Sequence, residues 1–181
     1  SIEEIIIPEK VNGYTVTRIG IDAVKVRSRL IISKTVEVIE YYAISGMEYS
    51  VIFLSGSNLR EVEQGGFYGN KATIFTHGGN RECDRIRELV QGYWNWGMSF
   101  VDHSASYAEE MGCDGTQHWH NVKCTECNLD KKVIFEGYNY EIVSKDGGEV
   151  HTCKTCNKKF FYKNGLKYEL ESSEKANVVG V

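Results

Sequence analysis

Four short apolar runs recur along the first hundred residues at a nearly constant distance. They read EIIIP (4–8), RLIIS (29–33), SVIFL (50–54) and ATIFT (72–76). The third apolar residues of the runs are 25, 21 and 22 positions apart: Ile7, Ile32, Phe53 and Phe75. Runs of β-branched and aromatic residues of this length predict short strands. The first part of the chain is therefore expected to contain four equivalent strands.

A second apolar pattern lies between these strands, in VTRIGIDAV (16–24), VEVIEYYAI (36–44) and LREVEQGGF (59–67). Alignment of the three segments places Ile19 with Ile39 and Val62, and Val24 with Ile44 and Phe67. A period of 20–29 residues with paired apolar signals is typical of a solenoid of the leucine-rich kind. The alternative is an ordinary β-rich domain in which the spacing is a coincidence.

A helix is expected after the last of these strands. Asn80 is a suitable N-cap, and Ile86, Leu89 and Val90 recur at helical spacing, which predicts one apolar face. A short strand in GMSFVDH (97–103) would follow. A helix at this position would cover the apolar edge of the last repeat.

These features resemble the BspA-type leucine-rich repeat of bacterial surface proteins. The resemblance lies in a strand followed by I-x-x-x-A-hydrophobic-x-G, best seen from Ile39 to Gly46, and in the final strand, glycine turn and helix. It covers residues 1–102 and implies adhesion or recognition at the bacterial surface, hence a surface or secreted location. If the start at Ser1 is artificial, a longer array lies upstream.

Two Cys-x-x-Cys pairs are the strongest chemical signal in the chain. Cys124 and Cys127 are separated from Cys153 and Cys156 by 25 residues that include strand-like sequence and an Asp-Gly-Gly turn. A spacing of two residues directs both sulfurs of a pair toward one ion, and two such pairs complete a tetrahedral zinc–sulfur shell. The pattern predicts a zinc-ribbon-like module with one structural zinc on these four cysteines.

Other uses of the cysteines remain open at this stage. Disulfides are favoured if the protein is extracellular, whereas reduced, zinc-bound thiols fit the cytoplasm. The redox interpretation has weaker support, because redox-active pairs usually lie at the start of a helix. His118 or His120 could form a separate site with Cys124 and Cys127, and His151 is another possible ligand.

The two remaining cysteines are Cys83 and Cys113. Cys83 is expected to be a buried apolar residue of the helix. Cys113 would be either free or paired with Cys83, and the sequence does not distinguish the two.

Composition excludes some function classes. The 181 residues are 41% apolar and carry a net charge of −4 with a pI near 5.8, so no general basic field attracts nucleic acid or anionic membrane. No apolar run is long enough to span a bilayer. The sequence contains no nucleophile elbow, P-loop or dinucleotide fingerprint, and four cysteines would close a zinc site to substrate. The prediction is a protein without catalytic activity.

The predicted fold is α+β and mostly β. Residues 1–102 would form a short leucine-rich-repeat solenoid with a helical C-terminal cap, and residues 103–181 a small β-rich zinc-ribbon-like module. The predicted function is recognition or adhesion, with a protein or surface ligand as partner and an unknown oligomeric state. The alternative is a nucleic-acid-binding zinc ribbon that uses Phe160, Phe161 and Tyr162 among lysines for stacking, with the repeats as a scaffold for protein interactions.

Overall fold

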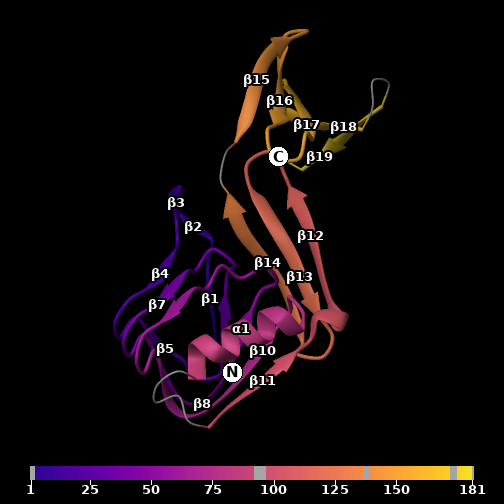
Figure 1. Cartoon of the computed structure of the whole chain (residues 1–181). Helices are drawn as coiled ribbons and strands as arrows, with labels where there is room; N and C mark the ends of the chain where they lie inside the picture. The colour runs from indigo at the N-terminus through magenta and orange to yellow at the C-terminus, as the bar shows by residue number, and fades with distance from the viewer. Residues whose placement is uncertain (1–2, 92–96, 137–138, 172–174, 181) are drawn as a thin grey trace. The chain divides into compact units, whose positions relative to one another are not determined.

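The computed structural model describes residues 3–91, 97–136, 139–171 and 175–180 (Figure 1). The chain forms two compact units. Unit 1 contains Ser1–Glu110 and Asn121–Val133, and unit 2 contains Met111–His120 and Ile134–Val181. The sequence predicted domains at 1–102 and 103–181. Unit 1 therefore includes the first Cys-x-x-Cys pair, which the sequence had assigned to the same domain as the second pair.

The main sheet of unit 1 is parallel. Its strand order is β1 (Glu4–Ile7), β6 (Arg29–Ile32), β8 (Ile44–Phe53), β10 (Phe67–Thr76) and β11 (Met98–Asp102). The short strand β5 (Val24–Lys25) pairs with the start of β8. The strands are rich in Ile, Val and Phe because a parallel sheet is covered on both faces and selects apolar residues at consecutive positions.

Much of the predicted strand alignment is confirmed by the register. Ile7 pairs with Ile32, and Ile32 pairs with Phe53. In the last step the alignment was wrong by one residue, since Phe75 pairs with Ile52. Val51, Ile52 and Phe53 are all fully buried, so apolar pattern alone does not fix which of them faces which neighbour.

The segments between the main strands form two smaller sheets. Strands β2 (Lys10–Val11) and β3 (Tyr14–Thr15) make an antiparallel hairpin around Asn12 and Gly13, which both have positive φ. Strands β4 (Arg18–Ile19), β7 (Val38–Ile39) and β9 (Glu61–Val62) form a parallel sheet. Here Ile19 pairs with Ile39 and Ile39 with Val62, as the sequence alignment placed them.

Helix α1 (Asn80–Gln91) begins one residue earlier than predicted: Asn80, expected as the N-cap, is its first residue, and the carbonyl of Gly79 accepts from the N–H of Cys83. The helix buries Cys83, Ile86 and Val90. It precedes β11, which pairs with β10, and a short 3-10 helix η1 (Ser104–Ser106) follows. Across the described ranges, no helix has the length and apolar character needed to cross a membrane.

The predicted leucine-rich-repeat solenoid with a helical C-terminal cap is wrong. The described residues are mostly strand with one α-helix, and the strands belong to several separate small sheets instead of a continuous solenoid. The repeat in the sequence sets the spacing of parallel strands, but the connecting segments are not equivalent. The first contains the β2–β3 hairpin, whereas the last contains α1. The strand predicted after the helix is present as β11, which pairs with β10.

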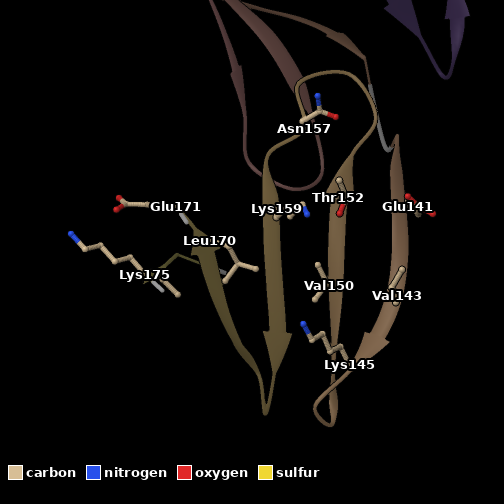
Figure 2. A pocket seen from close by; sticks show the side chains of 11 residues that line it. Glu141, Val143, Lys145, Val150, Thr152, Asn157, Lys159, Leu170, Glu171 and Lys175 are labelled. Atoms are coloured by element: carbon tan, nitrogen blue, oxygen red, sulfur yellow. The ribbon is translucent and has the colours of Figure 1, made fainter. Parts of the chain in front are cut away.

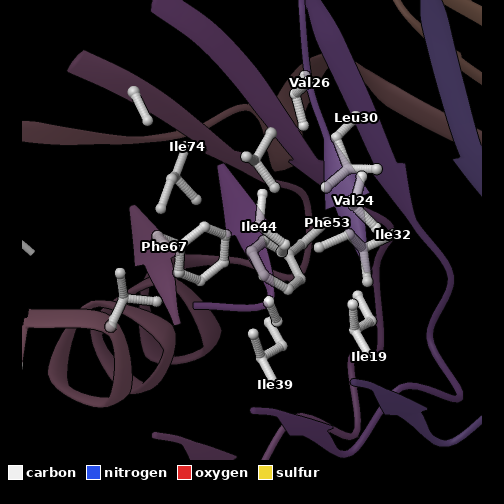
Figure 3. Close-up of a cluster of buried hydrophobic side chains, with 14 of the residues drawn as sticks. Ile19, Val24, Val26, Leu30, Ile32, Ile39, Ile44, Phe53, Phe67 and Ile74 are labelled. Atoms are coloured by element: carbon white, nitrogen blue, oxygen red, sulfur yellow. The ribbon is translucent and has the colours of Figure 1, made fainter. Parts of the chain in front are cut away.

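The core of unit 1 lies between the main sheet, the β4–β7–β9 sheet and α1 (Figure 3). Ile39, Ile44, Phe53, Phe67 and Ile74 are among its most buried side chains. Aromatic and branched residues from successive strands fill this space together. A second apolar cluster includes Ile31, Ile52 and Leu54 and also contains Cys124 and Leu129.

The remaining strands include those that carry both cysteine pairs. Strands β12 (Tyr107–Cys113), β13 (His118–Cys124) and β14 (Leu129–Glu136) form a three-stranded sheet. An antiparallel sheet that lies entirely in unit 2 follows in sequential order: β15 (Tyr140–Lys145), β16 (Gly148–Cys153), β17 (Lys159–Lys163), β18 (Leu166–Leu170) and β19 (Ala176–Val179). Asp146–Gly147 and Asn164–Gly165, all with positive φ, form two of its turns, as expected for tight hairpins.

Truncation of a central core side chain tests this packing. Phe53 is fully buried, so Phe53→Ala should lower the free energy of unfolding by about 3–5 kcal/mol through lost burial and a cavity. Urea titration followed by circular dichroism measures the change. Tyr14→Ala, at an exposed position of β3, should change the value by less than about 0.5 kcal/mol. Equal effects of the two substitutions would contradict the packing described here.

Candidate metal centres

Two groups of cysteine and histidine side chains converge in the structure. Group 1 consists of His77, His103, Cys124 and Cys127. Group 2 consists of Cys113, His118, Cys153 and Cys156. In each group the four ligand atoms lie within 4.8 Å of one another, and all four residues belong to a single compact unit. Both groups could hold a metal ion.

Strand ends bring the histidines of group 1 together. His77 directly follows β10 and His103 directly follows β11. Thr76 and Asp102, the last residues of these strands, are register partners, so the next residue of each strand reaches the same edge of the sheet. Cys124 ends β13, and Cys127 lies in the turn that leads into β14.

Hydrogen bonds orient His77 for metal binding. Its Nδ1 lies 2.8 Å from the carbonyl oxygen of Phe53, which fits an Nδ1–H donor and leaves Nε2 deprotonated. Nε2 lies 3.4 Å from Sγ of Cys127. Burial lowers the pKa of His77, although the bond to Phe53 opposes the shift. The neutral imidazole that a metal requires is therefore favoured.

His103 presents a buried nitrogen without a hydrogen bond. Its Nε2 lies 3.2 Å from a carboxylate oxygen of Glu126, whereas Nδ1 has no hydrogen-bond partner among the described residues. A buried polar atom without a partner is costly. A metal ion bound at Nδ1 would give this nitrogen a partner. Nε2 would then carry the proton and donate a hydrogen bond to the carboxylate of Glu126.

The two thiols of group 1 have little contact with solvent: Cys124 is buried and Cys127 is half-buried. Burial, followed by the neighbouring Cys124 thiol, raises the pKa of Cys127 to about 12. Arg29 opposes this shift and donates from Nη1 to the carbonyl oxygen of Cys127 at 2.8 Å. Two adjacent buried sulfurs do not ionise together without a compensating charge. A divalent cation would supply that charge.

Group 2 combines residues from the two chain segments that make up unit 2. Cys113 ends β12, His118 begins β13 and Cys153 ends β16. Nε2 of His118 lies 2.6 Å from Sγ of Cys153, and Sγ of Cys113 lies 2.8 Å from the hydroxyl oxygen of Tyr140. The Tyr140 ring also stacks on His118, with ring centroids 5.7 Å apart. Tyr140 thus contacts two members of the group and fixes their positions.

The turn after β16 directs amide hydrogens toward a sulfur. The backbone N–H groups of Thr155 and Cys156 donate to Sγ of Cys153 at 3.3 and 3.2 Å. Burial disfavours ionisation of Cys153, but these bonds and that of His118 lower its pKa to about 7. Burial and the nearby Cys153 and Cys113 thiols raise the pKa of Cys156 to about 11. Cys153 is therefore the thiol of group 2 whose ionisation its hydrogen bonds favour.

Both Cys-x-x-Cys turns end in a left-handed asparagine. Asn128 follows Cys127 with φ 52°, and Asn157 follows Cys156 with φ 61°. Asparagine tolerates this conformation better than most residues other than glycine. This conformation ends the turn after the second cysteine and leads the chain into the next strand. The two sulfurs of each pair remain close enough to belong to one group.

The ligand sets fit a tetrahedral ion. Zinc bonds to sulfur and nitrogen of about 2.0–2.3 Å imply ligand–ligand distances of about 3.3–3.8 Å, which lie below the 4.8 Å limit that both groups meet. The 2.6 Å between Nε2 of His118 and Sγ of Cys153 is shorter and would have to widen on binding. Thiolate together with imidazole is a donor set that zinc accepts readily. Four protein ligands are the number that a tetrahedral shell needs.

The four predicted zinc ligands are divided between the two groups. Cys124 and Cys127 belong to group 1, while Cys153 and Cys156 belong to group 2. His118, considered as a partner of the first pair, instead lies with the second pair. His120 stacks on Phe135, with ring centroids 4.2 Å apart, and Nε2 of His151 lies 3.0 Å from Glu149. Neither belongs to a metal group.

Three members of the groups were not anticipated: His77, His103 and Cys113. The repeat contained a signal for the two histidines, because His77 and His103 are 26 residues apart and each follows an aligned strand. For Cys113 the sequence contained no signal beyond the presence of a cysteine without an assigned partner. The lone Cys83 behaves as predicted: it is buried in α1, with Arg87 3.8 Å from its sulfur.

The aromatic side chains proposed for base stacking differ in their exposure: Phe160 is buried, whereas Phe161 and Tyr162 are partly exposed. Phe160 is buried with Cys113, Tyr140 and Cys153, and the ring of Phe161 packs near Tyr168. Unit 2 has a cavity of about 1000 Å³ over its antiparallel sheet (Figure 2). Its lining mixes lysines and glutamates with Val143, Val150 and Leu170 and includes no member of group 2.

Comparisons with known protein families, with curated proteins and with solved structures find no match to this chain.

The left-handed residue after the second cysteine pair can be tested by substitution. Asn157→Val places a β-branched residue at φ 61° and should destabilise unit 2 by about 1–3 kcal/mol. Asn157→Gly should change stability by less than about 1 kcal/mol, because glycine adopts this conformation freely. Thermal unfolding of the zinc-loaded proteins measures both. Equal stability of the two variants would show that the turn does not have this conformation.

Proposed function

We propose that this protein is a non-enzymatic recognition protein in which each unit is organised around one structural zinc ion. The observation that carries the proposal is the convergence of four cysteine and histidine ligands twice, each time within one unit. Structural zinc contributes folding free energy directly, on the order of 10 kcal/mol in small modules. The partner would be a protein or a surface ligand.

The size of the apolar core supports a structural role in unit 2. Its buried cluster consists of Cys113, Tyr140, Cys153 and Phe160, so two of its four members are metal-group cysteines. Unit 1 has a much larger core of aliphatic and aromatic residues. A small sheet with so little apolar burial needs an additional cross-link, and a metal ion supplies one.

The absence of catalysis is part of the same proposal. In both groups the four protein ligands complete the coordination of a tetrahedral ion, whereas a catalytic zinc keeps a position for water or substrate. Disulfides and redox chemistry are the competing uses of these thiols. The imidazoles favour metal over both, because each group contains at least one histidine whose nitrogen is within reach of the sulfurs.

The stoichiometry of zinc tests the proposal. Protein purified without added metal should contain two zinc ions per chain by elemental analysis. Cys127→Ser and Cys156→Ser should each lose one of them, because each removes a ligand from a different group. Cys83→Ser is the matched control and should retain both, since Cys83 is a buried cysteine outside the groups.

Two other results would contradict the proposal. One zinc per chain that is lost in both Cys127→Ser and Cys156→Ser would indicate a single shell of four sulfurs. No zinc together with few reactive thiols after denaturation would indicate disulfides.

A further inference from the structure

Three successive β-turns of unit 1 share one backbone conformation. They span residues 20–23, 40–43 and 63–66, and in each the N–H of the fourth residue donates to the carbonyl of the first. The third residues have positive φ: Asp22 (53°), Tyr42 (50°) and Gly65 (65°). Glycine is preferred at such a position and aspartate is tolerated, but a bulky aromatic residue is a true outlier. Tyr42 is therefore the exception that needs an explanation.

Burial does not explain Tyr42. Its side chain belongs to a surface cluster with Tyr41 and Tyr68, and the three residues are 37%, 41% and 59% exposed. The ring centroids of Tyr41 and Tyr42 are 3.9 Å apart, and those of Tyr42 and Tyr68 are 4.9 Å apart. We call these residues the tyrosine cluster. Its rings remain accessible to solvent at the end of the turns.

The next turn is shaped to accommodate the Tyr42 ring. A Cβ atom at Gly65 would lie 2.7 Å from a ring carbon of Tyr42, closer than side chains approach one another. The ring thus lies directly over the backbone of the equivalent turn position. Backbone strain at Tyr42 and a glycine beneath its ring hold an exposed aromatic platform in place. Strain maintained at an exposed position is typical of functional sites.

A carboxylate without a cationic partner lies beside this platform. Oε2 of Glu63 accepts the backbone N–H of Tyr41 at 2.9 Å. Glu63 makes no ion pair with any residue in the described part of the chain, whereas the equivalent Glu40 pairs with Arg18 at 2.8 Å. Residues 36–70 contain five glutamates and one arginine, with no lysine or aspartate. The segment therefore carries a formal charge of −4, although Glu37, Glu40 and Glu61 form ion pairs with Arg60 or Arg18.

We propose that the tyrosine cluster and Glu63 form a docking site for a lysine or arginine side chain of a partner protein. The faces of tyrosine rings attract cations, and a nearby carboxylate supplies the opposite charge. The acidic segment would also attract a basic peptide over a longer range. The inference rests on the recognition role proposed above and names the chemistry of the partner, but it does not depend on the zinc ligands.

The test uses the full zinc-loaded chain and two fluorescent probe peptides. One is a flexible glycine-serine peptide with four lysines, and the other carries four glutamines at the same positions. Fluorescence anisotropy should show binding of the lysine peptide that weakens with salt, and much weaker binding of the glutamine peptide. Equal affinity for the two peptides would overturn the proposal, because it would show that the site does not select the positive charge of lysine.

Substitutions locate the binding site. Tyr41→Ser and Tyr68→Ser should each weaken binding of the lysine peptide by about two- to fivefold, and Glu63→Gln should weaken it and reduce its dependence on salt. Tyr14→Ser is the matched control, because Tyr14 is 80% exposed in the β2–β3 hairpin and outside the cluster. An equal loss in the control, or no loss in the cluster variants, would contradict the assignment.

Tyr42→Asn separates binding from folding. Asparagine accepts the left-handed conformation of the turn, so this variant should keep the melting temperature while losing affinity for the lysine peptide. Zinc content is measured for every variant. Loss of peptide binding with two zinc ions retained supports the docking site. A wild-type protein with two zinc ions and no preference for lysine rejects the docking site alone.

Discussion

The burial of reactive polar groups next to one another is the constraint on which the structure depends. Each unit places four cysteine and histidine side chains within 4.8 Å, and most of them are buried. Burial and the adjacent thiol raise the pKa of Cys127, and Nδ1 of His103 has no hydrogen-bond partner among the described residues. Such groups are costly unless they are neutralised together. A divalent ion does this with one interaction, which is why we place zinc at the centre of the account.

The two units depend on their metal groups to different degrees. Unit 1 has a large apolar core between two sheets and a helix, and group 1 lies at the ends of strands that this core already positions. In unit 2 the metal-group cysteines form part of a small core with Tyr140 and Phe160. Loss of the ion would thus disturb mainly the strand ends of unit 1. In unit 2 the ion would supply much of the cross-linking that a larger apolar core provides elsewhere. The large apolar core of unit 1 also offsets the free-energy cost of the left-handed backbone at Tyr42.

Sequence reasoning succeeded where the signal was local. The Cys-x-x-Cys spacing picked out four cysteines that belong to the two groups able to hold a metal, helix α1 begins within one residue of the predicted start, and the repeat gave the pairing of Ile19 with Ile39. It failed where the answer depends on elements distant in sequence. His77 and His103 join group 1 only because β10 and β11 end side by side, and Cys113 joins group 2 only because β12 ends near the turn after β16. The solenoid was wrong because equal strand spacing does not determine how the connecting segments fold.

The most direct test of the central claim is X-ray absorption at the zinc edge on the intact protein. The account predicts two ions that share five sulfur and three nitrogen ligands, since the groups contain five cysteines and three histidines in total. The nitrogen shell should show the scattering pattern of imidazole. A shell of four sulfurs without nitrogen would contradict the account, because it would require the two cysteine pairs to bind one ion together.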